Sequence, residues 1–252
     1  MMRTGNPALR AQTFVTAGRA ATPAEAMSIQ GTVNKTGLLL VLTLLGAGWT
    51  WRIFFAAGAD AAAAQAVSPY LWGGLIGGLV LALVTIFKRT WSPVTAPLYA
   101  LVEGLFLGGL SALFEAKFPG IVLQAVALTF GTLFALLFAY TSRLIKVTEN
   151  FKLGVVAATG GIFLVYMATM ILGFFGVGMP YIHGSGIMGI GFSLFVVVIA
   201  ALNLVLDFDF IEKGAEAGAP RYMEWYAAFG LMVTLIWLYI EILRLLAKLR
   251  SR

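Results

Sequence analysis

Long apolar runs separated by short polar connections dominate the chain. Crossing the roughly 30 Å hydrocarbon core of a bilayer takes about 20 residues of helix. Seven runs approach or exceed this length, at 37–57, 70–87, 94–114, 121–140, 153–175, 186–206 and 225–242. A backbone in lipid must satisfy its own hydrogen bonds, so runs of this length are expected to be helical. The pattern predicts an all-α integral membrane protein, a bundle of seven transmembrane helices.

The first 36 residues differ from the rest of the chain because they are mostly polar. Arg3, Arg10 and Arg19 are scattered through them, and no apolar segment follows closely enough to resemble a secretory signal. We expect residues 1–36 to form a flexible polar tail on the cytoplasmic side. Residues 37–252 are then the seven-helix transmembrane domain.

Composition supports this division and narrows the chemistry. The chain is 60% hydrophobic and only 11% charged, whereas globular chains average about 25% charged residues. It contains no cysteine and one histidine, which excludes thiolate sites and multi-histidine metal centres. The net charge of +6 lies mainly in the short connections, as membrane orientation requires. We therefore expect the lipid bilayer, and no nucleic acid, as a partner, and no cofactor.

The placement of lysine and arginine predicts the orientation. With the N-terminus inside, the outer loops hold only Lys117, in agreement with the excess of positive charge on the cytoplasmic side. The basic residues Arg244, Lys248, Arg250 and Arg252 then lie outside if the seventh run crosses fully. Either that run does not cross, or the earlier loops decide the orientation. We expect seven full spans and a cytoplasmic N-terminus.

Small residues predict close contacts between helices. The second run contains two overlapping glycine pairs with a spacing of four within residues 73–78, and the third contains Gly104 and Gly108. Such positions let helix backbones approach closely in lipid.

Two carboxylates stand where the sixth run should leave the hydrocarbon. Asp207 and Asp209 point about 200° away from each other on a helix, so only one of them can face the bundle. Asn203 lies one turn before Asp207 on the same face. We therefore expect Asp207 to face inward and Asp209 to reach the aqueous interface. The alternative is that both residues simply mark a helix end among the headgroups.

Two glutamates lie within the third and seventh runs. Glu103 is either a functional proton or cation group or a structural hydrogen-bonding group between helices. Arg52 is the only obvious cationic partner for Glu103 inside the membrane, unless the Arg52 side chain extends outward to the interface. Glu241 can be neutralised by Arg244, three residues later on the same helix. Thr234 lies on the same helix face as Glu241 and is the other polar group of the seventh run that can face the sixth run.

The sequence lacks the motifs of the common catalytic sites. The stretch Gly189-Ile-Gly-Phe-Ser193 superficially resembles a serine nucleophile turn, but no glycine follows the serine and no helix carries a histidine base. An intramembrane aspartyl protease needs two facing aspartates on neighbouring helices, whereas Asp207 and Asp209 share one helix. We therefore expect that the protein is not an enzyme and has no catalytic residues.

Four motifs follow one another along the spans in a characteristic order. They are Pro97-Leu-Tyr-Ala-Leu-Val-Glu103-Gly-Leu-Phe-Leu-Gly108, the stretch from Ala127 to Arg143, Leu204-Val-Leu-Asp207-Phe-Asp209, and Leu238-Tyr-Ile-Glu241. In this order and spacing the chain resembles the transmembrane Bax inhibitor motif family. The resemblance covers roughly residue 37 to the C-terminus, and the long polar N-terminal segment is typical of a divergent bacterial branch.

The resemblance implies a bundle with the last helix in its centre, in the bacterial plasma (inner) membrane. It also implies a pH-sensitive calcium leak gated by two acids near the cytosolic ends of the sixth and seventh helices. Two close carboxylates cannot both ionise cheaply, so such acids share a proton when the path is closed and separate on deprotonation. Calcium or another cation is then the permeant ion.

The family pattern can be placed on this chain residue by residue. Asp207 matches the acid of the sixth helix. Two alignments to the family pattern place the acid of the seventh helix differently. Matching the family's leucine-tyrosine run to Leu238-Tyr-Ile places the acid at Glu241, whereas an ungapped alignment of the C-terminal ends places Thr234 there. Glu241 lies about 24 Å along the seventh run, which is too far from Asp207 unless the helix begins later. The basic partner at the end of the second helix matches Lys88 or Arg89.

Three functions remain open at this point. The first is a pH-sensitive cation (calcium) leak channel gated by buried carboxylates. The second is a non-conducting membrane regulator that binds other membrane proteins or a membrane protease through the basic tail and the glycine faces. The third is proton-coupled transport through Glu103.

Overall fold

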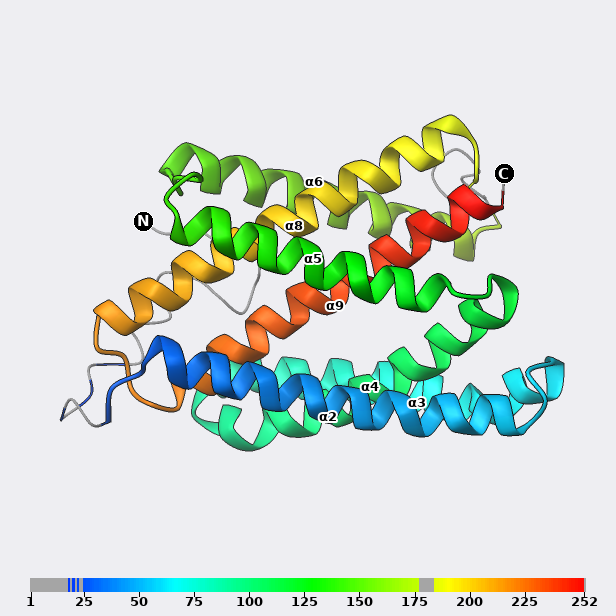
Figure 1. Ribbon diagram of the computed structural model, residues 1–252, viewed down its shortest axis with the longest axis horizontal. Coiled ribbons are helices and arrows are strands. Elements are labelled where there is room, and N and C mark those ends of the chain that lie inside the picture. Colours follow the sequence, from blue (N-terminus) through cyan, green and yellow to red (C-terminus); the bar gives the residue numbers. More distant parts are fainter. Residues whose placement is uncertain (1–17, 19, 21, 23–24, 177–183, 252) are drawn as a thin grey trace. The chain divides into compact units, whose positions relative to one another are not determined.

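The computed structural model of the chain describes residues 18, 20, 22, 25–176 and 184–251 (Figure 1). In this part of the chain one 3-10 turn, η2 (Arg89–Trp91), accompanies seven long helices. These are α2 (Ile29–Ala56), α3 (Ala61–Phe87), α4 (Ser92–Lys117), α5 (Ile121–Thr141), α6 (Glu149–Phe174), α8 (Ile187–Glu216) and α9 (Met223–Arg250). By length and composition all seven can cross a membrane. The prediction of an all-α protein with seven spans is confirmed for the described residues.

Most of the helices extend beyond the apolar runs that predicted them. α2 begins at Ile29, where the Ser28 side chain accepts a hydrogen bond from the Gly31 backbone, whereas the apolar run begins only at Gly37. A helix can continue past the hydrocarbon because side-chain caps and water satisfy its end groups. The predicted tail, residues 1–36, therefore overlaps the start of α2. Most of its other residues lie outside the described part of the chain, and its flexibility stays a prediction.

The described residues form two compact units. Unit 1 contains Leu123–Asp209 and Val233–Arg252, and unit 2 contains Thr13–Val122 and Phe210–Met232. α8 and α9 each contribute one part to unit 1 and the other part to unit 2. The central position expected for the last helix stays a prediction, because its two parts belong to different units.

Unit 2 is built around α2, α3 and α4, which lie side by side (Figure 1). A Cβ atom on Gly104 or Gly108 of α4 would collide with the backbone of α2. A Cβ on Gly74 of α3 would lie only 2.7 Å from the backbone nitrogen of Phe106 in α4. Gly73, by contrast, faces open space. The close contacts predicted from the glycine spacing are therefore confirmed, and Gly74 rather than Gly73 makes the contact on α3.

Unit 1 brings α5 and α6 together with the first part of α8 and the last part of α9. Val196 and Ile199 of α8 belong to its core, and Trp237 of α9 packs against them. Lys248, near the end of α9, donates a 2.8 Å hydrogen bond to the Ser193 hydroxyl, near the start of α8. These contacts show that α8 and α9 run antiparallel in unit 1.

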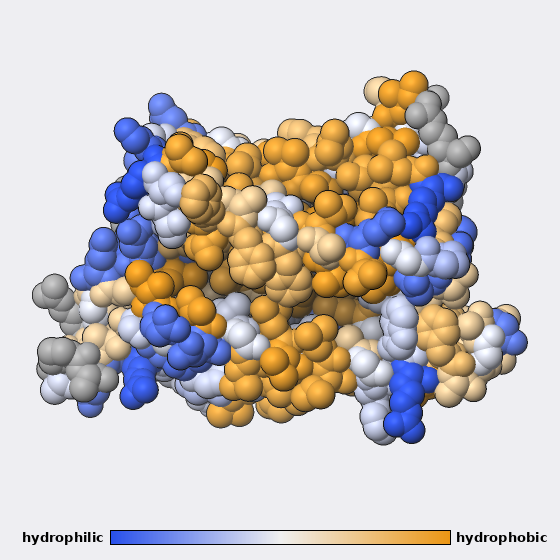
Figure 2. All heavy atoms as spheres, viewed as in Figure 1, coloured by the Kyte–Doolittle hydropathy of each residue, from blue (hydrophilic) through white to orange (hydrophobic). Residues whose placement is uncertain are grey.

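Large apolar side chains cover much of the outer surface of the helices. Leu44, Leu79, Phe138 and Leu164 are each at least 60% exposed. On the face shown in Figure 2, apolar side chains cover the middle of the helices and hydrophilic ones gather toward the helix ends. Soluble monomers rarely expose apolar surface on this scale. A surface of this kind fits contact with lipid chains.

The glycine contact between α3 and α4 can be tested with two neighbouring substitutions. Gly74→Ala should lower the free energy of unfolding by about 1–3 kcal/mol, because the added methyl group meets backbone atoms that cannot move away easily. Gly73→Ala is the matched control and should change stability by at most about 1 kcal/mol, in either direction. Denaturant titration of the purified protein in mixed micelles measures both. Equal losses in the two variants would contradict the close contact.

Candidate functional site

Buried polar side chains follow one another along the second half of α8. Asp207 is 0% exposed, and Asn203, one turn earlier, is 2% exposed. The Asn203 amide donates 2.8 Å hydrogen bonds to the Thr159 hydroxyl of α6 and to the Ile199 carbonyl. Asp207 is therefore buried inside the protein, as the position of Asn203 predicted.

Asp209 is buried as well, which corrects the expectation that it reaches the aqueous interface. Lys152, in the first turn of α6, places its ammonium 3.5 Å from an Asp209 oxygen and 2.8 Å from Glu149. The Lys152 side chain is only 4% exposed. A nearby ammonium compensates a buried carboxylate for the water it has lost. Lys152 and Asp209 are far apart in the sequence, and no pattern in it predicted this pair.

Glu241 lies far from Asp207 within unit 1. Its Oε1 accepts hydrogen bonds from the Tyr166 hydroxyl at 2.9 Å and from Arg244 at 3.0 Å. The Tyr166 ring packs against Phe192 of α8, and Asp207 lies about 22 Å further along that helix. This geometry rules out Glu241 as the acid opposite Asp207. The alternative that Arg244 neutralises Glu241 locally is confirmed.

Thr234 lies nearer to the level of Asp207 than Glu241 does. Lys248 donates to Ser193 where the antiparallel helices α9 and α8 meet. Thr234 comes about 21 Å before Lys248 along α9, and Asp207 comes about 21 Å after Ser193 along α8. Thr234 is 3% exposed. Of the two residues left open by the sequence, Thr234 is the one closer in height to Asp207.

Glu103 is buried in unit 2, away from any cation of the described residues. It is 9% exposed, and its Oε2 packs against Gly78 of α3. Arg52, the cationic partner considered from the sequence, is exposed. Within the described residues Glu103 makes neither an ion pair nor the structural hydrogen bond that was the alternative. Among the described residues, the aspartates and glutamates do not form a group of three that could hold a metal ion.

The two basic residues after α3 also belong to unit 2. Lys88 is exposed at the C-cap of α3, and the Arg89 guanidinium lies 5.8 Å from the centre of the Tyr226 ring. Burial raises the pKa of the nearby Tyr222 phenol, and the charge of Arg89 acts in the opposite direction. A role for Lys88 or Arg89 as a partner of Asp207 stays a prediction, because Asp207 belongs to unit 1.

A second ionic cluster, at the start of α9, was not found from the sequence. Glu224 is 2% exposed, accepts 2.9 Å hydrogen bonds from the backbone and hydroxyl of Ser28, and pairs with Lys35. The backbone of Met27 also donates to the Ala219 carbonyl. Through these contacts the segment before α2 binds to the connection between α8 and α9 and to the first turn of α9. An acid in the first turn of a helix is the only local signal that could have suggested the cluster.

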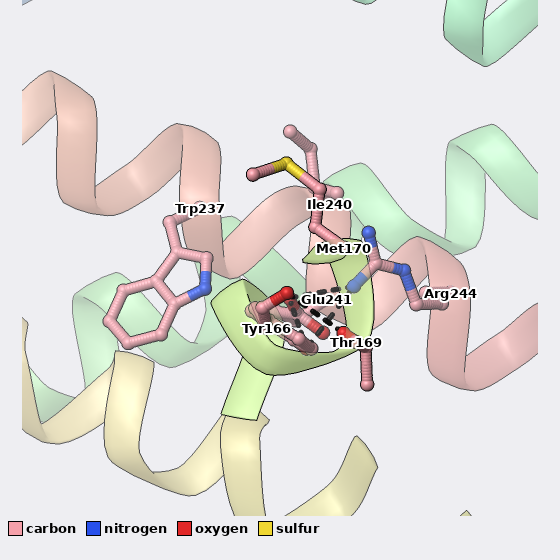
Figure 3. Close-up of a pocket in the computed structure, with 7 residues that line it drawn as sticks. All are labelled: Tyr166, Thr169, Met170, Trp237, Ile240, Glu241 and Arg244. Atoms are coloured by element: carbon pink, nitrogen blue, oxygen red, sulfur yellow. Dashed lines mark hydrogen bonds and ion pairs between the residues drawn. The ribbon is translucent and has the colours of Figure 1, made fainter. Parts of the chain in front are cut away.

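Unit 1 also contains an open groove between α6 and α9, shown in Figure 3, with a volume of about 490 Å³. Its wall is formed by Tyr166, Thr169 and Met170 of α6 and by Trp237, Ile240, Glu241 and Arg244 of α9. In Figure 3 the Tyr166 hydroxyl and the Arg244 guanidinium converge on Glu241, while Trp237 flanks the other side. The two charged residues of the groove, Glu241 and Arg244, thus lie away from Asp207.

The buried pair of Lys152 and Asp209 can be tested by a double-mutant cycle. Lys152→Met should lower the free energy of unfolding by about 3 kcal/mol, because it removes a cation that compensates the buried Asp209. Adding Asp209→Asn should restore at least about 1 kcal/mol of this loss. Glu149→Gln, the control at the exposed partner of Lys152, should cost less than about 1 kcal/mol. Strictly additive effects of the two substitutions would contradict the pairing.

Comparison with known proteins agrees with this architecture. A family model described as "Bax inhibitor 1 like" matches residues 6–251, nearly the whole chain. No curated protein and no solved structure matches the sequence. The family match and the seven apolar helices of the described residues lead to one conclusion. The chain is an integral membrane protein of the Bax inhibitor 1-like family.

Proposed function

We propose that this protein is a pH-sensitive cation leak channel, with Ca²⁺ as the permeant ion and Asp207 as the gating group. The observation that carries the proposal is the complete burial of this carboxylic acid in an apolar helix. A charged aspartate at mid-bilayer costs about 2.5–3.5 kcal/mol on insertion scales, so such residues are rare and usually mark ion or proton pathways. In a leak channel the acid can be neutral while the path is closed and charged when it opens.

The surroundings of Asp207 supply further oxygen atoms for a cation. Asn203 lies one turn away, bonded to the Thr159 hydroxyl, and Thr234 is the candidate oxygen on α9. Calcium prefers carboxylate, carbonyl and other oxygen ligands and accepts flexible geometry. Deprotonation of Asp207 therefore adds a negative charge beside these oxygen atoms, which attracts both water and a cation.

The ion-paired acids of unit 1 are not the gating group in this proposal. Asp209 lies beside Lys152, whose ammonium compensates the buried carboxylate for the water it has lost. Glu241 is likewise paired, with Arg244. In this proposal a single acid, rather than a pair of acids, senses pH.

Flux of Ca²⁺ into liposomes that contain the purified protein tests the proposal. Flux should rise with pH, because deprotonation opens the path, and Asp207→Asn should remove this pH dependence. Glu216→Gln, an exposed acid near the end of the same helix, is the control and should behave like the unaltered protein. Absence of flux at every pH would contradict the channel and favour a non-conducting regulator that binds other membrane proteins.

A second acid placed opposite Asp207 tests the assignment of Thr234. In Thr234→Asp two neighbouring carboxylates cannot both ionise cheaply, so a proton stays on the pair to higher pH. The onset of flux should then move upward by about one pH unit. Thr234→Asn, which adds no charge, should leave the onset near its original position. The same onset in both variants would show that Thr234 does not face Asp207.

A further inference from the structure

The groove between α6 and α9 contains a carboxylate that is only half satisfied. The Glu241 side chain is 2% exposed, and its Oε1 accepts from Tyr166 and Arg244 (Figure 3). Its other oxygen, Oε2, is buried and has no hydrogen-bond partner among the described residues. A buried carboxylate oxygen without a donor has lost its water and gained no contact in exchange. The arrangement becomes complete when a ligand supplies that donor.

Arg244 offers the complementary chemistry in the same groove. One terminal nitrogen donates to Glu241 and Tyr166, and the remaining N–H groups make no hydrogen bond to the described residues. The side chain is 39% exposed, so these N–H groups are accessible from the open side of the groove. Guanidinium groups bind phosphate with several parallel hydrogen bonds. The groove therefore presents an acceptor for an ammonium group beside donors for a phosphate group.

The groove lies near one end of α6 and one end of α9. α6 and α9 contain 26 and 28 residues, which makes them about 39 and 42 Å long and longer than a hydrocarbon core of about 30 Å. Tyr166 lies about 12 Å from the end of α6, and Arg244 about 9 Å from the end of α9. A long arginine side chain reaches the headgroups from this depth. Tryptophan and tyrosine, here Trp237 and Tyr166, are the residues enriched at this boundary.

We propose that this groove binds a phospholipid whose headgroup carries a primary amine, of the ethanolamine class. The phosphate accepts hydrogen bonds from Arg244, which turns toward it and uncovers Glu241, and the ammonium group donates to Glu241 Oε2. One acyl chain lies along Met170, which is 52% exposed, and Ile240. A choline headgroup has no N–H to donate, and a glycerol headgroup has no positive charge. The site should therefore select the amine.

Native mass spectrometry of the full chain in detergent tests this site. The protein is mixed with equal amounts of dioleoyl-phosphatidylethanolamine, -phosphatidylcholine and -phosphatidylglycerol, and the retained lipid is counted. The ethanolamine lipid should be retained about tenfold more strongly than either competitor, as expected for one hydrogen bond to a charged group. Glu241→Gln should remove this preference, and Arg244→Gln should lower the retention of all three lipids.

Three further variants separate a lipid site from a general effect on folding. Met170→Trp fills the groove from its exposed side without touching the contacts of Glu241, and it should lower retention of the ethanolamine lipid. Arg52→Gln removes an exposed charge in unit 2 and should change nothing. Asp207→Asn should keep the lipid preference even if it alters cation flux, because the two sites are independent.

Three results would each overturn the proposal. The first is equal retention of the three lipids by the unaltered protein. The second is an unchanged preference in Glu241→Gln together with unchanged retention in Met170→Trp. The third is binding of soluble phosphoethanolamine as tight as binding of the lipid, because the apolar wall of the groove would then contribute nothing.

Discussion

A charged group that an apolar helix carries into the membrane loses its water, and the surrounding lipid offers no hydrogen bonds in exchange, so a partner inside the protein stabilises it. This constraint accounts for the main polar contacts of both units. In unit 1 Lys152 pairs with Asp209, and Arg244 pairs with Glu241. In unit 2 Lys35 pairs with the buried Glu224. The pairs Lys152–Asp209 and Lys35–Glu224 each join two helices, whereas Arg244 and Glu241 belong to the same helix.

The spans and the glycine contacts could be predicted from the sequence because they depend on local properties. The length of an apolar run decides whether it can cross a bilayer, and glycines with a spacing of four lie on one face whatever surrounds them. Gly104 and Gly108 accordingly contact α2. The helix ends were less predictable, since caps such as Ser28 extend a helix beyond its apolar run.

The partners of the buried acids could not be predicted in the same way. Asp209 is buried because of Lys152, which comes from another helix far away in the sequence. The choice between Glu241 and Thr234 depended on the register of α9 against α8, which is visible only where Lys248 meets Ser193. Sequence spacing limits which residues share a helix face, but it does not fix how one helix is shifted along another.

The fastening of the N-terminal segment to the last connection has a consequence for biosynthesis. Met27 and Ser28 precede the first described helix, yet their partners Ala219 and Glu224 are translated only after six helices have been made. Contacts of such long sequence separation form late, after the intervening chain has been placed. Met27 and Ser28 therefore wait for these partners while six helices enter the bilayer, and they dock only when the first turn of α9 has emerged from the ribosome.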